Sequence, residues 1–156
     1  MPSVTLPDQV TLALIAAHNV LRDCQHGWHV FGSCALALYG IRGIEVRDID
    51  ILIDEKDARL LSQHSEISDE SGGGTELFRS TYFFRLKHQA TDIEIMADMK
   101  VRTGDRWDAF QFATTQSICA AGRDFTVPAL DELKQSLRRF GRTKDLARLK
   151  LIEEQT

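Results

Sequence analysis

The chain has 156 residues, of which 43% are hydrophobic and 27% are charged, and its formal net charge at pH 7 is -4. This length and composition predict one globular domain, residues 1–156, and the acidic balance argues against DNA binding, which usually needs a basic excess. The cysteines lack a CxxC spacing, the N-terminus lacks the pattern of a signal peptide, and no apolar stretch approaches the ~18 residues of a membrane span. We therefore expect a cytoplasmic protein with no membrane partner.

The N-terminal part of the chain contains a predicted helix and then a strand. Apolar residues recur at helical spacing from residue 8 to residue 22, which predicts an amphipathic helix. A short apolar run, Trp28–Phe31, predicts a strand that stops at Gly32-Ser33, and the small residues of Cys34–Tyr39 predict a second helix. Backbone N–H groups at such a strand-to-helix turn form an anion site, and a glycine leaves room for the anion to approach.

An alternating segment at residues 46–53 carries two acidic residues, Asp48 and Asp50. Side chains point alternately to the two faces of a strand, so both carboxylates share one face while Ile49 and Ile51 share the other. Like charges at this spacing repel each other unless a cation lies between them, and carboxylate oxygens suit Mg²⁺. The alternative is an ordinary strand whose acidic residues face solvent.

The middle of the chain contains a helical segment, a polar loop and further strands. Residues 55–64 predict a helix, and residues 65–75, with three consecutive glycines, predict a surface loop because the GxxxxGK pattern of a phosphate-binding loop is absent. Residues 92–96 alternate again and place Asp92 and Glu94 on one face. Other short segments have the residue preferences of strands, at 77–80, 82–87, 107–112 and 117–121.

The strands at 77–80 and 82–87 are compatible with a hairpin or with one long bent strand, and residues 101–106 predict a turn. Two helices are predicted after this region, one at residues 129–139 and one that begins near Thr143, a plausible N-cap. Several cations lie in or between these helices: Arg138, Arg139, Arg142, Lys144 and Arg148. Because the helix dipole disfavours cations at a helix N-terminus, Arg142 and Lys144 indicate an anionic partner such as a triphosphate. The alternative is a solvated helical face.

The order of Gly32-Ser33, a helix and Asp48-Ile49-Asp50 resembles the signature of the nucleotidyltransferase superfamily typified by DNA polymerase β. The segments FGSCALALYGIR and Arg142-Thr143-Lys144-Asp145 are similar to its small bacterial members, the AbiEii-like and antibiotic-adenylating groups. This resemblance implies an α+β fold, in which helices pack on a mixed sheet and a helix pair ends the chain. It also implies a third carboxylate from a later strand, for which Glu94 is the first candidate and Asp92 the second.

The resemblance further implies a site for Mg²⁺ or Mn²⁺ and a nucleoside triphosphate. The implied catalytic and metal-binding residues are Asp48, Asp50 and Glu94. The implied nucleotide-binding residues are Gly32, Ser33, Arg42, Arg142 and Lys144. The chain departs from the family in two places, because most relatives carry Asp in place of Glu94 and often carry a lysine where Leu137 lies.

The implied reaction is transfer of a nucleoside monophosphate from the triphosphate to a hydroxyl group, with two metal ions. Its acceptor is a small molecule, a protein side chain or an RNA end, and the sequence does not choose among them. The alternative function is that of a catalytically silent domain of the same fold that acts as a binding protein or as a toxin–antitoxin partner.

Overall fold

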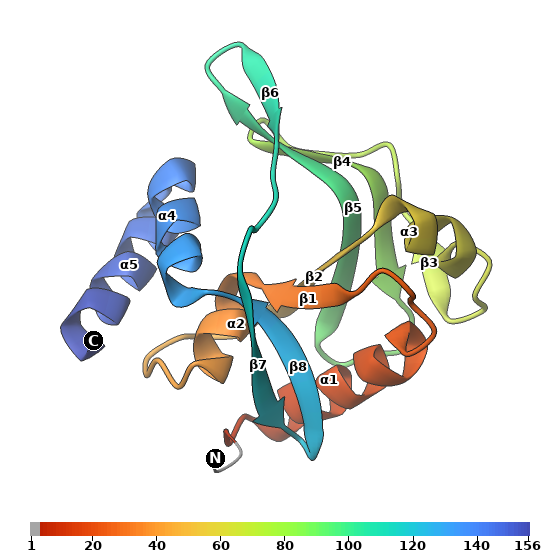
Figure 1. Ribbon diagram of the computed structural model, residues 1–156, viewed down its shortest axis with the longest axis horizontal. Coiled ribbons are helices and arrows are strands. Elements are labelled where there is room, and N and C mark those ends of the chain that lie inside the picture. The colour runs from red at the N-terminus through yellow and green to blue at the C-terminus, as the bar shows by residue number, and fades with distance from the viewer. Residues whose placement is uncertain (1–3) are drawn as a thin grey trace.

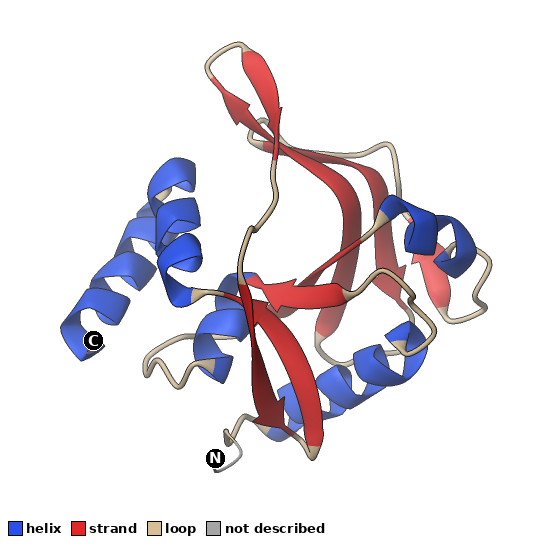
Figure 2. Ribbon diagram, viewed as in Figure 1, coloured by secondary structure: helices blue, strands red, loops and turns tan. Residues whose placement is uncertain are grey.

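The computed structural model describes residues 4–156, which form a mixed α+β structure (Figures 1 and 2). The elements in chain order are α1 (Asp8–Leu21), β1 (Trp28–Phe31), α2 (Gly32–Leu38), β2 (Asp48–Ile53), α3 (Glu55–Leu61), β3 (Ile67–Asp69), β4 (Phe78–Leu86), β5 (Asp92–Thr103), β6 (Arg106–Ala109), β7 (Thr115–Ala120), β8 (Arg123–Pro128), α4 (Leu130–Phe140) and α5 (Thr143–Gln155). The mixed sheet and the C-terminal helix pair confirm the predicted fold class. None of the described helices is long and apolar enough to cross a membrane.

The main sheet has the strand order β1-β2-β5-β4-β3, and β6 pairs with the far end of β5. The central pair, β2 and β5, is parallel, whereas β1–β2, β4–β5 and β3–β4 are antiparallel. A separate hairpin of β7 and β8 packs against β1. The parallel register sets Asp50 opposite Glu94, so acidic residues that are far apart in the sequence meet on neighbouring strands.

One face of the sheet is covered by helices and forms the core. Ile49 and Ile51 of β2 and Ile93 and Ile95 of β5 each have 0% exposure. Helix α1 packs on both strands, and α3 packs on β5. Because side chains alternate along a strand, the burial of these isoleucines directs the acidic residues between them to the opposite face.

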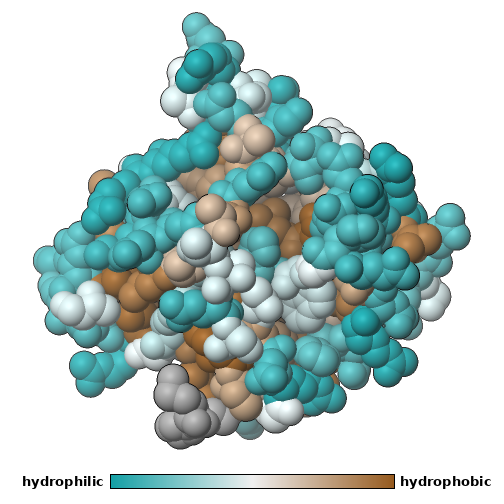
Figure 3. All heavy atoms as spheres, viewed as in Figure 1, coloured by the Kyte–Doolittle hydropathy of each residue, from teal (hydrophilic) through white to brown (hydrophobic). Residues whose placement is uncertain are grey.

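The last two helices pack against each other at the side of the molecule opposite α3 (Figure 1). Gly141 ends α4 in the left-handed region, at φ 64°, and its N–H donates to the carbonyl oxygen of Leu137. The predicted N-cap of α5 was Thr143, but the helix is capped one residue earlier, by Arg142. The surface seen in Figure 3 is mostly hydrophilic, with apolar residues showing around a hollow near its middle.

The structure corrects several predicted boundaries. The predicted loop at 65–75 contains the short strand β3, which pairs with β4 because Ile67 packs into the core. The predicted turn at 101–106 is tighter, since β5 continues to Thr103 and β6 begins at Arg106. Strand β8 was not predicted, and β4 is one long strand, the second of the two alternatives.

Candidate functional site

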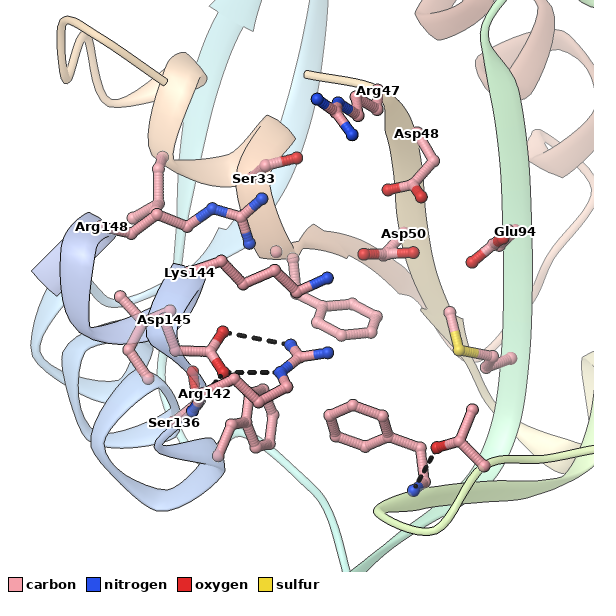
Figure 4. Close-up of a pocket in the computed structure, with 18 of the residues that line it drawn as sticks. Ser33, Arg47, Asp48, Asp50, Glu94, Ser136, Arg142, Lys144, Asp145 and Arg148 are labelled. Atoms are coloured by element: carbon pink, nitrogen blue, oxygen red, sulfur yellow. Dashed lines mark hydrogen bonds and ion pairs between the residues drawn. The ribbon is translucent and has the colours of Figure 1, made fainter. Parts of the chain in front are cut away.

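A cleft of about 850 Å³ lies between the open face of the sheet and the C-terminal helices. Strands β2, β4 and β5 form one wall, and α4 and α5 form the other (Figure 4). The sheet wall carries the acidic residues of the central strands, while the helix wall carries Lys144 and Arg148. The start of α2, at Gly32 and Ser33, lines the cleft between the two walls.

Asp48, Asp50 and Glu94 come together on the sheet wall. One ligand oxygen from each of these carboxylates lies within 4.8 Å of the other two, a spacing that could hold a metal ion. Asp92 lies outside this group: it is the register partner of Asp48, but its side chain is 61% exposed and pairs with Arg85 at 3.2 Å. Of the two candidates for the third carboxylate, the structure therefore brings Glu94 into the group.

The positive charge near the three carboxylates does not offset their burial and mutual repulsion. Burial, then Asp48 and Glu94, raise the pKa of Asp50 well above its usual range, and Arg148 opposes this shift. Burial and then Asp48 also raise the pKa of Glu94, which Arg85 partly offsets. Carboxylates that repel each other in this way retain protons or bind a cation. Oxygen ligands at this spacing fit a hard divalent ion such as Mg²⁺ or Mn²⁺.

Gly32 allows the start of α2 to lie directly against Asp50. Its φ is +66°, in the left-handed region, and a Cβ atom at this position would lie 2.6 Å from Asp50 Oδ2. A residue with a side chain would therefore be strained and would also clash with the carboxylate. Ser33 follows with only 4% exposure and lines the cleft. The glycine thus places a backbone turn and a hydroxyl group beside the acidic residues.

The helix wall places two cations across the cleft from the carboxylates (Figure 4). The amine of Lys144 points toward the acidic group, and the guanidinium of Arg148 points toward Ser33. No ion pair within the described part of the chain involves either side chain. Both cations can therefore bind an anionic ligand without giving up a carboxylate partner.

Arg142 also lines the cleft, but its guanidinium is held by Asp145. Nε lies 2.6 Å from Asp145 Oδ2 and Nη2 lies 3.1 Å from Oδ1, while the backbone N–H of Arg142 donates to Oδ2 at 3.1 Å. Asp145 has 0% exposure, and the guanidinium also lies over the ring of Phe78, 5.0 Å from its centroid. These contacts hold the junction between α4 and α5 and give Arg142 a structural role.

Arg42, the remaining residue of the implied nucleotide site, is not among the residues that line the cleft. Its backbone N–H and carbonyl oxygen bond to the side chain of Gln155, which joins the loop after α2 to the end of α5.

Two other cations line the cleft. Arg47, which we did not predict as a site residue, lies beside Asp48 (Figure 4). Arg148 was considered only as part of a charged helical face, although its spacing four residues after Lys144 places both on one side of the helix.

Comparisons with known proteins establish the fold. No protein-family model matches the chain, and no curated protein sequence matches it. A crystal structure described as a "putative nucleotidyltransferase" from Thermotoga maritima is similar over 97% of this chain and 97% of its own, with a TM-score of 0.74 and 24% sequence identity. At this level of identity the likeness concerns the fold, and the chain therefore has a nucleotidyltransferase-like fold.

Proposed function

We propose that the protein is a metal-dependent nucleotidyltransferase, which transfers a nucleoside monophosphate from a nucleoside triphosphate to a hydroxyl group. The observation that supports this most is the meeting of Asp48, Asp50 and Glu94 within 4.8 Å on one wall of the cleft. Lys144 and Arg148 on the other wall supply positive charge for the phosphates. The Arg-x-Lys-Asp sequence that opens α5 further favours the small AbiEii-like group, and the cysteine usage favours the cytoplasm.

In this proposal the acidic residues hold Mg²⁺ or Mn²⁺, which when bound offsets phosphate charge and lowers the pKa of the attacking hydroxyl. The acceptor oxygen forms a bond to the α-phosphorus while the bond to the bridging oxygen of the β-phosphate breaks, and pyrophosphate leaves. Glu94 accepts the proton of the hydroxyl, because its carboxylate lies beside Asp48 and Asp50 on the wall of the cleft where the hydroxyl would be activated. Ser33, Lys144 and Arg148 hold the triphosphate.

The experiment uses each nucleoside triphosphate labelled at the α-phosphate, with Mg²⁺ or Mn²⁺ and a cell extract separated into small molecules, proteins and RNA. We expect the label to enter one of these fractions with the native protein and none with Asp50→Asn, which keeps the size of the side chain but removes its charge. Absence of transfer with every nucleotide and every fraction would refute the proposed activity. The labelled fraction would identify the class of acceptor.

A second candidate function is that of a catalytically silent domain that binds a partner protein, as in a toxin–antitoxin pair. The observation that favours it is the ion pair between Arg85 and Glu94, whose atoms lie 3.3 Å apart and occupy part of the acidic group with a protein cation. A silent domain should bind metal and nucleotide weakly in isolation. A titration of the protein with Mn²⁺ and a nucleoside triphosphate therefore separates the two candidates.

A further inference from the structure

Arg85 lies at the end of the row of acidic residues that crosses the sheet. It is the register partner of Glu94, which in turn lies opposite Asp50. Its Nη1 atom lies 3.3 Å from Glu94 Oε1 and 3.2 Å from Asp92 Oδ2, and its Nε atom lies 3.3 Å from Glu70. A cation of the protein itself therefore contacts one of the three carboxylates that we assign to the metal.

We propose that Arg85 is a built-in counter-ion that competes with divalent metal ions for Glu94, so that the protein binds metal tightly only together with a nucleoside triphosphate. The inference rests on the proposed function, because it concerns the same metal site. It adds an order to the binding events, in which the metal enters with the nucleotide instead of residing in the protein beforehand.

The surroundings of Arg85 allow it to release Glu94 at little cost. When Glu94 turns to a metal ion, the guanidinium keeps its contacts with Glu70 and Asp92. These two carboxylates are 41% and 61% exposed, whereas that of Glu94 is 22% exposed and faces the cleft. A guanidinium has five N–H donors in a planar fork, so it stays paired after losing one acceptor.

The positive charge of Arg85 determines whether its removal strengthens or weakens metal binding. Because Arg85 Nη1 lies 3.3 Å from Glu94 Oε1, a divalent ion held by Glu94 would be close to the guanidinium. Repulsion over about 6 Å would weaken binding by roughly tenfold even at the dielectric constant of water. A nucleoside triphosphate brings additional anionic oxygens to the metal and offsets this repulsion. The neutral variant Arg85→Gln should therefore bind the metal alone more tightly than the native protein does.

The test is a titration with Mn²⁺ followed by the electron paramagnetic resonance signal of the free ion, with and without each nucleoside triphosphate. We expect Arg85→Gln to bind Mn²⁺ about tenfold or more tightly than the native protein without nucleotide, and the ratio to shrink when nucleotide is present. Arg85→Lys keeps the charge and should stay close to the native protein. Arg79→Gln is the matched control, because Arg79 lies on the same strand but stacks on Trp107 at 4.2 Å.

Two outcomes overturn the inference: measurable Mn²⁺ binding that is equal or weaker in a folded Arg85→Gln protein than in the native protein, or an equal gain in Arg79→Gln. Circular dichroism shows whether each variant is folded, and Arg85→Thr, with a residue that suits a strand, replaces the glutamine variant if that one unfolds. Failure of the proposed function has a different signature. In that case neither the native protein nor any Arg85 variant binds Mn²⁺, with or without nucleotide.

Discussion

Replacing Asp50 by Asn should make the metal-free protein more stable. The ligand oxygens of the three carboxylates lie within 4.8 Å of one another. At that separation two unit charges repel each other by about 1 kcal/mol at the dielectric constant of water and by about 3 kcal/mol at an effective value of 20. Asn has the same shape as Asp and can donate a hydrogen bond to Glu94, so the substitution removes charge without opening a cavity.

We expect a gain of about 1–3 kcal/mol in the free energy of unfolding, because part of the repulsion that is removed is offset by the lost attraction to Arg148. For a chain of this size that gain raises the unfolding temperature by about 2–10 °C. The measurement is thermal unfolding near neutral pH in a buffer that contains a chelator. Asp92→Asn is the control: it removes an exposed acid from the neighbouring strand, outside the group of three, and should change stability little.

The pH dependence of this gain tests its cause. Burial and the neighbouring carboxylates raise the pKa of Asp50 in the folded protein. Between the unfolded and folded pKa values the folded state binds more protons, so the native protein loses stability as the pH rises from about 4 through that window. The advantage of Asp50→Asn should therefore be small at acid pH and grow toward neutral pH. An unfolding temperature of Asp50→Asn equal to or below the native value near neutral pH would refute the reasoning.

Three further predictions concern Gly32, Arg142 and His29. Gly32→Ala should lower stability by about 2 kcal/mol or more in urea unfolding, since φ is +66° and the new Cβ atom lies 2.6 Å from Asp50 Oδ2; a variant of native stability would contradict this. Arg142→Ala should lower the free energy of unfolding by about 2–3 kcal/mol, because the fully buried Asp145 loses both guanidinium contacts and keeps only the backbone N–H of residue 142, whereas native stability with weakened nucleotide binding would assign Arg142 to the ligand instead. Burial lowers the pKa of His29 to about 4, so the folded protein loses stability as the pH falls from about 6.5 to about 4. His29→Phe should therefore move acid unfolding, measured by circular dichroism, to lower pH.

Local patterns in the sequence predicted most of the elements because apolar residues recur at a regular spacing in both helices and strands. The apolar run Trp28–Phe31 is β1 with the predicted bounds, and the alternation at 46–53 contains β2, Asp48–Ile53. Strand β8, at Arg123–Pro128, has a weaker alternation of apolar residues, and its stability depends on pairing with β7 and packing against β1. Both contacts are properties of the folded chain.

The acidic group was predictable only in part, because its completion depends on how two distant strands pair. Alternation placed Asp92 and Glu94 on one face of their strand, but only the parallel register of β2 and β5 sets Glu94 opposite Asp50. Arg85 reaches Glu94 through a third strand, and no local pattern marks that contact. Pairing between strands carries no short-range signal of its own.

The capping role of Arg142 is the reverse case, because the sequence contains a local signal for it. Asp145 lies three residues after Arg142, the spacing of an acid at the third position of a helix that bonds back to the N-cap. The predicted phosphate site includes Arg142 as a free cation, whereas this spacing pairs it with the neighbouring acid. Lys144, two residues further on, carries the same charge without a carboxylate in that position.

The balance of charge in the cleft separates structural residues from those available to a ligand. Arg142 and Asp145 satisfy each other at 2.6 Å, and nothing else is needed to explain their charges. Asp50 lies among like charges on the sheet wall, while Lys144 faces it from the helix wall without an acidic partner in the described part of the chain. Like charges held close together without a cation between them lower the stability of a fold. A ligand with a metal ion at one end and phosphates at the other would remove the repulsion on the sheet wall and would bind the cations of the helix wall, as the proposed function requires.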